Sequence, residues 1–168
     1  MENTKAEDKG ISADLDMIRG FWIEAEDDLD AAERLLIEGK YSKVMYLCAQ
    51  FLEKLMKICL TCEGVIDIKS HGITGLFGKY VIAASPKRWK DRLEKIGRQI
   101  KLIERQYPKF RYPLRKGEDV WIPSLEYTKQ DAYDALEISK KAKQIFLEFL
   151  KGARSLDLKK LGKGGKNG

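Results

Sequence analysis

A run of basic and aromatic residues lies past the middle of the chain. It contains, in order, Arg105, Tyr107, Lys109, Phe110, Arg111, Tyr112, Arg115 and Lys116. Arginine and lysine bind phosphates, arginine with a planar fork of donors, and aromatic rings stack on nucleobases. The combination predicts a surface that binds a nucleotide or RNA. The alternative is a solvated basic surface whose aromatic side chains pack into the core.

The connection that carries most of this run has no regular pattern. From Pro108 to Tyr127 we find neither a helical nor a strand period, and the stretch contains three prolines. Pro108 and Pro113 each fix a backbone φ angle, so the charges between them have restricted freedom. A connection of this length inside a compact domain is usually functional or mobile.

The cysteines do not form a recognisable site. Cys48, Cys59 and Cys62 are odd in number, which does not favour a disulfide framework. Cys48 and Cys59 are roughly 16 Å apart along one predicted helix, too far to bridge. Cys59 and Cys62 lack the second pair that a zinc site needs. We predict buried, apolar-like thiols.

The sequence also does not favour a metal site or an acid–base site built on histidine. His71 is the single histidine, whereas a di-metal carboxylate bundle needs paired Glu-x-x-His motifs. The acidic cluster between Glu24 and Asp30 lies on one predicted helix, and hard cations need ligands that converge from several elements. We therefore predict a solvated acidic face, no metal and no cofactor.

Charge is distributed unevenly along the chain, whose net charge is +6. Residues 1–38 hold twelve acidic and four basic residues, whereas residues 87–116 hold twelve basic and three acidic ones. Two interpretations stay open. Oppositely charged helices lie side by side or associate between molecules, or the basic segment faces a polyanion.

Length and composition indicate one soluble globular domain. The chain has 168 residues, of which 43% are hydrophobic and 35% charged, and that length suffices for a substantial core. No apolar run approaches the length of a membrane span, and the polar N-terminus is not a secretory signal. We predict a cytoplasmic protein without membrane contact.

The stretch from Tyr41 to Glu63 predicts a central helix. Two apolar stripes run along it at steps of three and four, one beginning at Val44 and the other at Met45. A helix with so wide an apolar face is packed from more than one side. Its remaining narrow polar face carries Gln50, Glu53, Lys54 and Lys57.

Four further helices are predicted around it. They span residues 14–38, 71–84, 86–106 and 128–150; the second is short, capped by Ser70 and weakened by three glycines. Ser85 and Pro86 mark one helix start, and Thr128 with Asp131 marks the last. We predict an all-α, antiparallel up-and-down bundle of four main helices plus one short helix, without strands. Residues 1–13 form a flexible N-terminus, 14–150 the domain, and 151–168 a disordered basic tail.

The order of several short motifs resembles the HEPN domain family (higher eukaryotes and prokaryotes nucleotide-binding domain) over residues 14–150. The motifs are the turn that ends at Gly39, Ala49-Gln50-x-x-Glu53-Lys54-x-x-Lys57, Ser70-His71-Gly72-Ile73, Arg111-Tyr112-Pro113 and the helix led by Tyr127. The resemblance implies a dimerising helical bundle with a polar cleft at or near the dimer interface. Many members pair with a minimal nucleotidyltransferase in toxin–antitoxin-like modules, and others are metal-independent ribonucleases.

The chain departs from the ribonuclease members in one motif. In those members four to six residues separate an arginine from a histidine that follows it, and the corresponding arginine positions before His71 are occupied by Gly64, Val65 and Ile66. We therefore interpret His71 as a capping or packing residue. The first hypothesis is a non-catalytic homodimer that binds nucleotide or RNA, a nucleotidyltransferase partner, or both. The alternatives are a divergent ribonuclease using Glu53, Lys54, Arg105 and Tyr107, and a helical scaffold with a vestigial cleft.

The resemblance also selects the predicted ligand-binding residues. It places the Arg111-Tyr112-Pro113 segment near the cleft, so Arg111 is the predicted phosphate contact. Gln50, Glu53 and Lys54 would form the opposite wall. The full predicted set is Gln50, Glu53, Lys54, Arg105, Tyr107, Arg111 and Tyr112.

Overall fold

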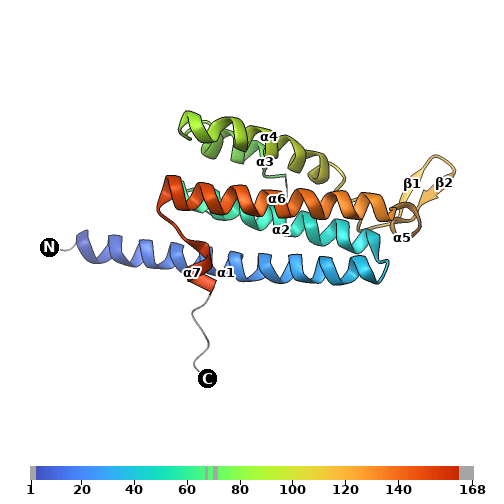
Figure 1. The fold of residues 1–168 in the computed structure, drawn as a ribbon, viewed down its shortest axis with the longest axis horizontal. Coiled ribbons are helices and arrows are strands. Elements are labelled where there is room, and N and C mark those ends of the chain that lie inside the picture. The colour runs from blue at the N-terminus through green and yellow to red at the C-terminus, as the bar shows by residue number, and fades with distance from the viewer. Residues whose placement is uncertain (1–2, 67, 70–71, 163–168) are drawn as a thin grey trace, which may run out of the picture.

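Four long helices form the molecule in a computed structural model that describes residues 3–66, 68–69 and 72–162, with side chains from residue 14 onward. Figure 1 shows these helices packed lengthwise: α1 (Asn3–Ile37), α2 (Tyr41–Cys62), α4 (Lys87–Glu104) and α6 (Lys129–Arg154). The short elements are α3 (Thr74–Phe77), the π-helix η1 (Gly78–Ile82), β1 (Leu114–Lys116), β2 (Asp119–Trp121), α5 (Pro123–Glu126) and α7 (Leu158–Gly162). The predicted all-α helical bundle is confirmed.

Helix α2 is the centre of the core. It packs against α1, α6 and α4, and both predicted apolar stripes are buried: Val44 and Phe51 belong to the first, and Met45 and Leu52 to the second. None of these four side chains exposes more than 2% of its surface. Because α2 is covered from several sides, its polar side chains are confined to a narrow strip.

A tight turn joins α1 to α2. Gly39 has a φ of +72°, which an L side chain rarely adopts, and the Lys40 amide donates a hydrogen bond to the Leu35 carbonyl at 3.0 Å. The short link between the two helices is as predicted. The predicted start of the first helix is not, because α1 begins at Asn3 rather than at Asp14.

The third predicted helix is shorter and less regular than expected. Regular α-helix is confined to Thr74–Phe77, and a π-helical turn follows from Gly78. Glu104, from the end of α4, accepts hydrogen bonds from the Thr74 amide, at 3.0 Å, and from the Thr74 hydroxyl. A side chain from another helix thus fixes the start of α3. The predicted cap, Ser70, lies outside the described residues.

Helix α4 buries the predicted stripe. Its buried side chains are Trp89, Leu93, Ile96, Ile100 and Ile103. Pro86 is the N-cap residue rather than the first helical residue. The Ser85 hydroxyl donates to the Val81 carbonyl at 2.6 Å and does not cap α4.

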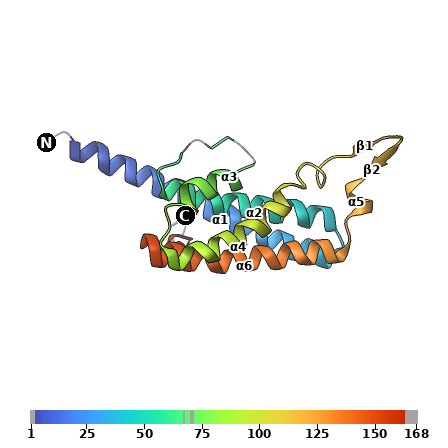
Figure 2. The same ribbon diagram turned by 90° about the horizontal axis from the view of Figure 1, so that it is seen from above.

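The prediction that the chain lacks strands is wrong. Residues 114–121 form an antiparallel hairpin in which Leu114 pairs with Trp121 and Lys116 with Asp119. Gly117, with a φ of +61°, makes the turn. Strands of three residues are too short to produce an alternating pattern in the sequence, which explains why they were not predicted. Figure 2 shows the hairpin standing off one end of the bundle.

The last helix begins as predicted. The Asp131 amide donates to the Thr128 hydroxyl at 3.2 Å, and the Asp131 carboxylate accepts from the Thr128 amide at 2.8 Å, which completes a capping box. Residues 151–162, the described part of the predicted disordered tail, are largely helical. Helix α6 continues to Arg154, and α7 is held by the fully buried Leu158.

Among the described residues, the acidic helix α1 and the basic helix α4 form no ion pair with each other. Helices α1 and α4 lie on opposite sides of α2 and α6 (Figure 1). The acids of α1 pair instead with lysines of α2 and α6: Asp28 with Lys54, Glu33 with Lys140, and Glu26 with Lys143. No helix in the described part of the chain is long and apolar enough to cross a bilayer.

Candidate nucleic-acid interface

Arg111 lies among three tyrosine rings on the surface. Its guanidinium carbon is 5.1 Å from the ring centroid of Tyr46, 5.4 Å from that of Tyr107 and 5.0 Å from that of Tyr112. Its Nη1 donates a hydrogen bond to the Tyr107 hydroxyl. These four residues form what we call the tyrosine cluster. Since Arg111 and Tyr112 are exposed, the cluster presents a cation and aromatic surface to solvent.

The charge on Arg111 is available for a ligand. Among the described residues, no carboxylate lies within ion-pair distance of its guanidinium. Its guanidinium is protonated, as arginine always is in proteins, and the hydrogen bond to Tyr107 raises the pKa of Arg111 further. A permanent cation beside exposed aromatic faces suits a phosphate and a base together.

Phe110 anchors the cluster to the core. Its side chain is 1% exposed, and its ring centroid lies 6.3 Å from that of Tyr46, 5.4 Å from that of Tyr107 and 6.4 Å from that of Tyr127. Because Phe110 immediately precedes Arg111, this packing directs the arginine outward. The sequence left open whether the aromatic side chains of this run are exposed or packed into the core, and the structure shows both. Phe110 packs inward, whereas Arg111 and Tyr112 face solvent.

The polar strip of α2 continues the surface. Tyr46, Gln50 and Glu53 are spaced by four and three residues, so they lie on one helical face. Glu53 accepts a hydrogen bond from Lys57 at 2.7 Å. It also lines a small cleft between α2 and α4 together with Tyr107, Glu104 and several apolar side chains, and the cleft encloses about 20 Å³. That space holds roughly one water molecule, so a ligand would lie across its mouth.

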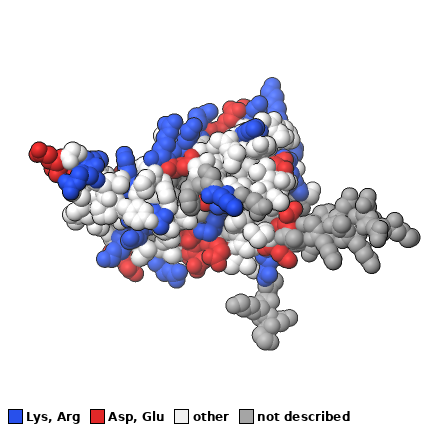
Figure 3. Space-filling view, turned by 180° about the vertical axis from the view of Figure 1, so that it is seen from behind, with Lys and Arg blue, Asp and Glu red and all other residues white. Residues whose placement is uncertain are grey.

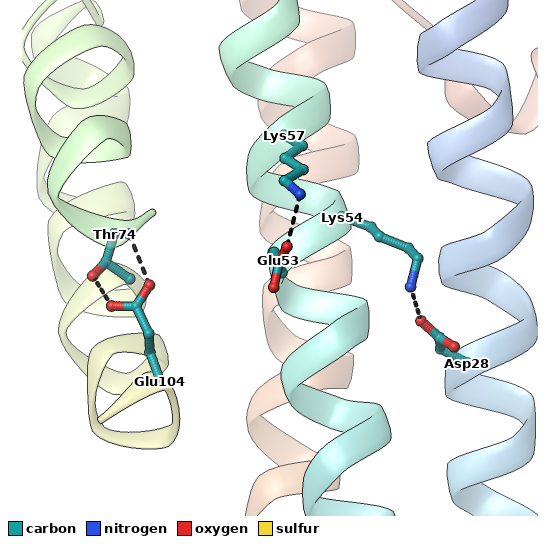
Figure 4. Close-up of polar contacts among 6 residues, drawn as sticks. All are labelled: Asp28, Glu53, Lys54, Lys57, Thr74 and Glu104. Atoms are coloured by element: carbon teal, nitrogen blue, oxygen red, sulfur yellow. Dashed lines mark hydrogen bonds and ion pairs between the residues drawn. The ribbon is translucent and has the colours of Figure 1, made fainter. Parts of the chain in front are cut away.

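Two predicted site residues lie apart from the cluster. Lys54 reaches across to Asp28 on α1, where its Nζ is 2.5 Å from Oδ2, as Figure 4 shows. Arg105 is exposed at the end of α4 and has no described contact with the cluster. Of the predicted set, the structure brings Tyr107, Arg111 and Tyr112 together and places Gln50 and Glu53 on the adjoining helical face.

Sequence analysis did not select two residues of this surface. Tyr46 touches Arg111 from α2, and its position one turn before Gln50 was the signal that it shares that face. Trp121 joins through the hairpin: its Nε1 donates to the Lys109 carbonyl at 2.9 Å. No short-range sequence pattern indicated that contact, because twelve residues separate the partners.

Helix α4, whose C-terminal end lies beside Tyr107, is strongly basic. The exposed bases of α4 are Lys87, Arg88, Lys90, Arg92, Lys95, Arg98 and Lys101. Figure 3 shows lysine and arginine side chains gathered along the edge formed by this helix, at the top of the view. A basic edge of this kind attracts a polyanion over a distance of about 10 Å at moderate salt.

The described residues offer no metal site: no group of three or more His, Cys, Asp or Glu side chains among them converges on one point.

Cys48 and Cys59 are buried, as predicted, and Cys62 is partly buried. Burial raises the pKa of Cys48 to about 12 and that of Cys62 to about 11. These thiols are protonated and unreactive near neutral pH.

Comparison with known proteins connects the chain to a family. The family model described as "HEPN domain" matches residues 18–151. A curated protein of Methanocaldococcus jannaschii, named "Putative toxin MJ1304", is 30% identical over 128 residues, which cover 76% of this chain and 84% of that protein. A crystal structure of ST0689, described as an archaeal HEPN homologue, matches with a TM-score of 0.54 and 23% identity. It covers 76% of this chain and 93% of that one.

Proposed function

The chain belongs to the HEPN domain family, and we propose that it is a non-catalytic member of a toxin–antitoxin-like module that binds RNA or a nucleotide in the cytoplasm. The tyrosine cluster is the binding surface in this proposal. The relative named as a toxin supports the type of module.

The observation that carries the proposal is the environment of Arg111. Three tyrosine rings surround an exposed guanidinium, and none of the described carboxylates pairs with it. An arginine that served only solubility would need no aromatic neighbours, although such contacts stabilise its position. One that binds a phosphate beside a base uses both the charge and the rings.

A second copy of the chain is the proposed protein partner, beside a nucleotidyltransferase of the kind that many family members have. A largely apolar groove of about 400 Å³ supports self-association; it is lined by α1, the end of α2 and the loop that follows, with Phe21 and Val65 among its residues. At its rim, Met17 and Ile66 expose 56% and 59% of their surfaces. Neighbouring exposed apolar side chains are typical of protein interfaces.

The first experiment is direct. Freshly purified protein is examined for an excess of absorbance at the nucleic-acid band, and its binding to labelled single-stranded RNA is then followed by fluorescence anisotropy. We expect bound RNA or nucleotide, and an affinity that falls as salt increases. Protein that carries no nucleotide and binds no RNA at low salt would contradict the proposal.

Catalysis is tested on the same samples. Glu53 and Tyr107 share the cleft, but Lys54 points away to α1, so the candidate ribonuclease residues do not converge on one point. We expect RNA to remain intact in the presence of a chelator. Cleavage that disappears in Glu53→Gln with the fold preserved would favour the divergent ribonuclease instead.

A further inference from the structure

The β1–β2 hairpin carries a second pair of a cation and an aromatic ring. Lys116 Nζ lies 4.2 Å from the centroid of the Trp121 ring. In the register of the hairpin, Leu114 is opposite Trp121 and Lys116 is opposite Asp119, so Lys116 and Trp121 are diagonal neighbours on one face. Arg115 and Val120 share the other face.

The ammonium of Lys116 lies over the Trp121 ring and forms no ion pair with its cross-strand neighbour Asp119. Asp119 is its cross-strand partner, yet none of the described carboxylates lies within ion-pair distance of Lys116. Lys116 is exposed and Trp121 is partly exposed. The arrangement therefore repeats that of Arg111, where a cation also lies over partly or fully exposed aromatic rings without a carboxylate partner among the described residues.

Trp121 fixes the hairpin relative to the tyrosine cluster. Its Nε1 donates to the carbonyl of Lys109, two residues before Arg111, at 2.9 Å. Its ring meets that of Tyr127 edge-on, with centroids 5.6 Å apart. The position of Trp121 is thus tied to the loop that presents Arg111, and the two pairs form neighbouring parts of one surface.

From this repetition we infer that the ligand is a single-stranded nucleic acid rather than a mononucleotide, and that Trp121 stacks on a base next to the nucleotide held at Arg111. The inference rests on the proposed function. A single strand alternates phosphates and unpaired bases, which two successive pairs of cation and ring can match. A duplex covers its base faces by stacking, so it would not use Trp121.

Binding changes the partner of the Trp121 ring. An incoming base takes the ring face that Lys116 covers, and the ammonium moves on its flexible stem to the adjacent phosphate. Trp22 and Trp89, the other two tryptophans, are 3% and 9% exposed. Tryptophan emission therefore reports on Trp121 when a base stacks there.

The test titrates the full chain with an oligouridine of about eight nucleotides and, separately, with uridine monophosphate. Binding is followed by anisotropy of the labelled oligonucleotide and by tryptophan emission. We expect the oligonucleotide to quench emission and to bind at least about tenfold more tightly than the mononucleotide. Trp121→Ala should weaken binding about tenfold, and Trp121→Phe should abolish the quenching while keeping most of the affinity.

Val120→Ala, on the opposite face of the hairpin, is the control and should change neither signal. Circular dichroism verifies that each variant is folded. Oligonucleotide binding that depends on Arg111, but with unchanged emission and full affinity in Trp121→Ala, would overturn this inference and leave the proposed function standing. So would equal affinity for mononucleotide and oligonucleotide. No binding of either ligand would overturn both.

Discussion

Lys54 Nζ lies 2.5 Å from Oδ2 of Asp28, and this ion pair joins α2 to α1 (Figure 4). Both side chains are about one-fifth exposed. Burial raises the pKa of Asp28 even though Lys54 opposes that shift. Lys54 therefore compensates a largely buried carboxylate, which makes it a structural residue rather than part of the binding surface.

Removing the Lys54 charge should weaken folding and spare binding. Lys54→Met keeps most of the apolar stem but leaves Asp28 without its cation, so we expect a loss of about 1–2 kcal/mol in unfolding free energy. The double variant with Asp28→Asn should recover part of this loss. Urea denaturation measures both. If Lys54→Met kept full stability but bound RNA more weakly, Lys54 would be a binding residue rather than a structural one.

Alkaline pH should destabilise the fold through its buried thiols. The pKa of Cys48 is about 12 and that of Cys62 about 11, against an ordinary value of 9.0. Above about pH 9 the unfolded chain loses these protons first, so the unfolding free energy falls as pH rises, whereas below that pH the thiols contribute no slope. Urea midpoints at pH 8 and pH 10 test this. In Cys48→Ala the fall should be smaller; an equal fall would exclude Cys48 as its source.

Gly152 is a position where a single methyl group should be costly. A Cβ built there would lie 2.9 Å from Cζ2 of Trp89, which packs between α4 and α6 against Phe149. We expect Gly152→Ala to lower the unfolding free energy by about 1–3 kcal/mol. Gly20→Ala is the matched control, because nothing lies within 4 Å of its Cβ, and it should stabilise α1 by about 0.5–1 kcal/mol. Equal effects at both positions would disprove the close packing.

Self-association should depend on the rim of the apolar groove. Met17→Glu would place a charge on that exposed apolar surface, and we expect it to convert a dimer into a monomer of about 19 kDa in light scattering. Ile37→Glu, at the C-terminal end of α1 and 88% exposed, should leave the mass unchanged. If the wild-type protein is a monomer at micromolar concentration, the proposed homodimer is wrong.

The bundle was predictable because its signals are local and periodic. The two stripes of α2 and the Thr128–Asp131 capping box each depend on residues three or four positions apart, and the structure confirms them. The hairpin and α7 were not predictable. Each depends on a contact between distant residues: Trp121 with Lys109, and Leu161 with Arg19, whose Nε donates to the Leu161 carbonyl at 3.0 Å.

The candidate site was partly predictable for the same reason. Arg111, Tyr107 and Tyr112 are close in sequence and close in space. Glu53 and Lys54 are adjacent in sequence but about 100° apart around the helix, so one faces the cleft and the other faces α1. The composition of a polar strip does not specify which neighbouring helix each side chain meets.

The most direct test of the account is the salt dependence of RNA binding by Arg111 variants. Arg111→Ala should weaken binding and reduce the log–log salt slope by about 0.7–1, the value of one phosphate contact. Arg111→Lys should keep the slope and lose affinity, since it retains the charge but not the planar fork. Lys151→Ala, an exposed lysine at the far end of α6, should match wild type. Equal affinities and slopes for wild type and Arg111→Ala would contradict the claim that the tyrosine cluster binds RNA.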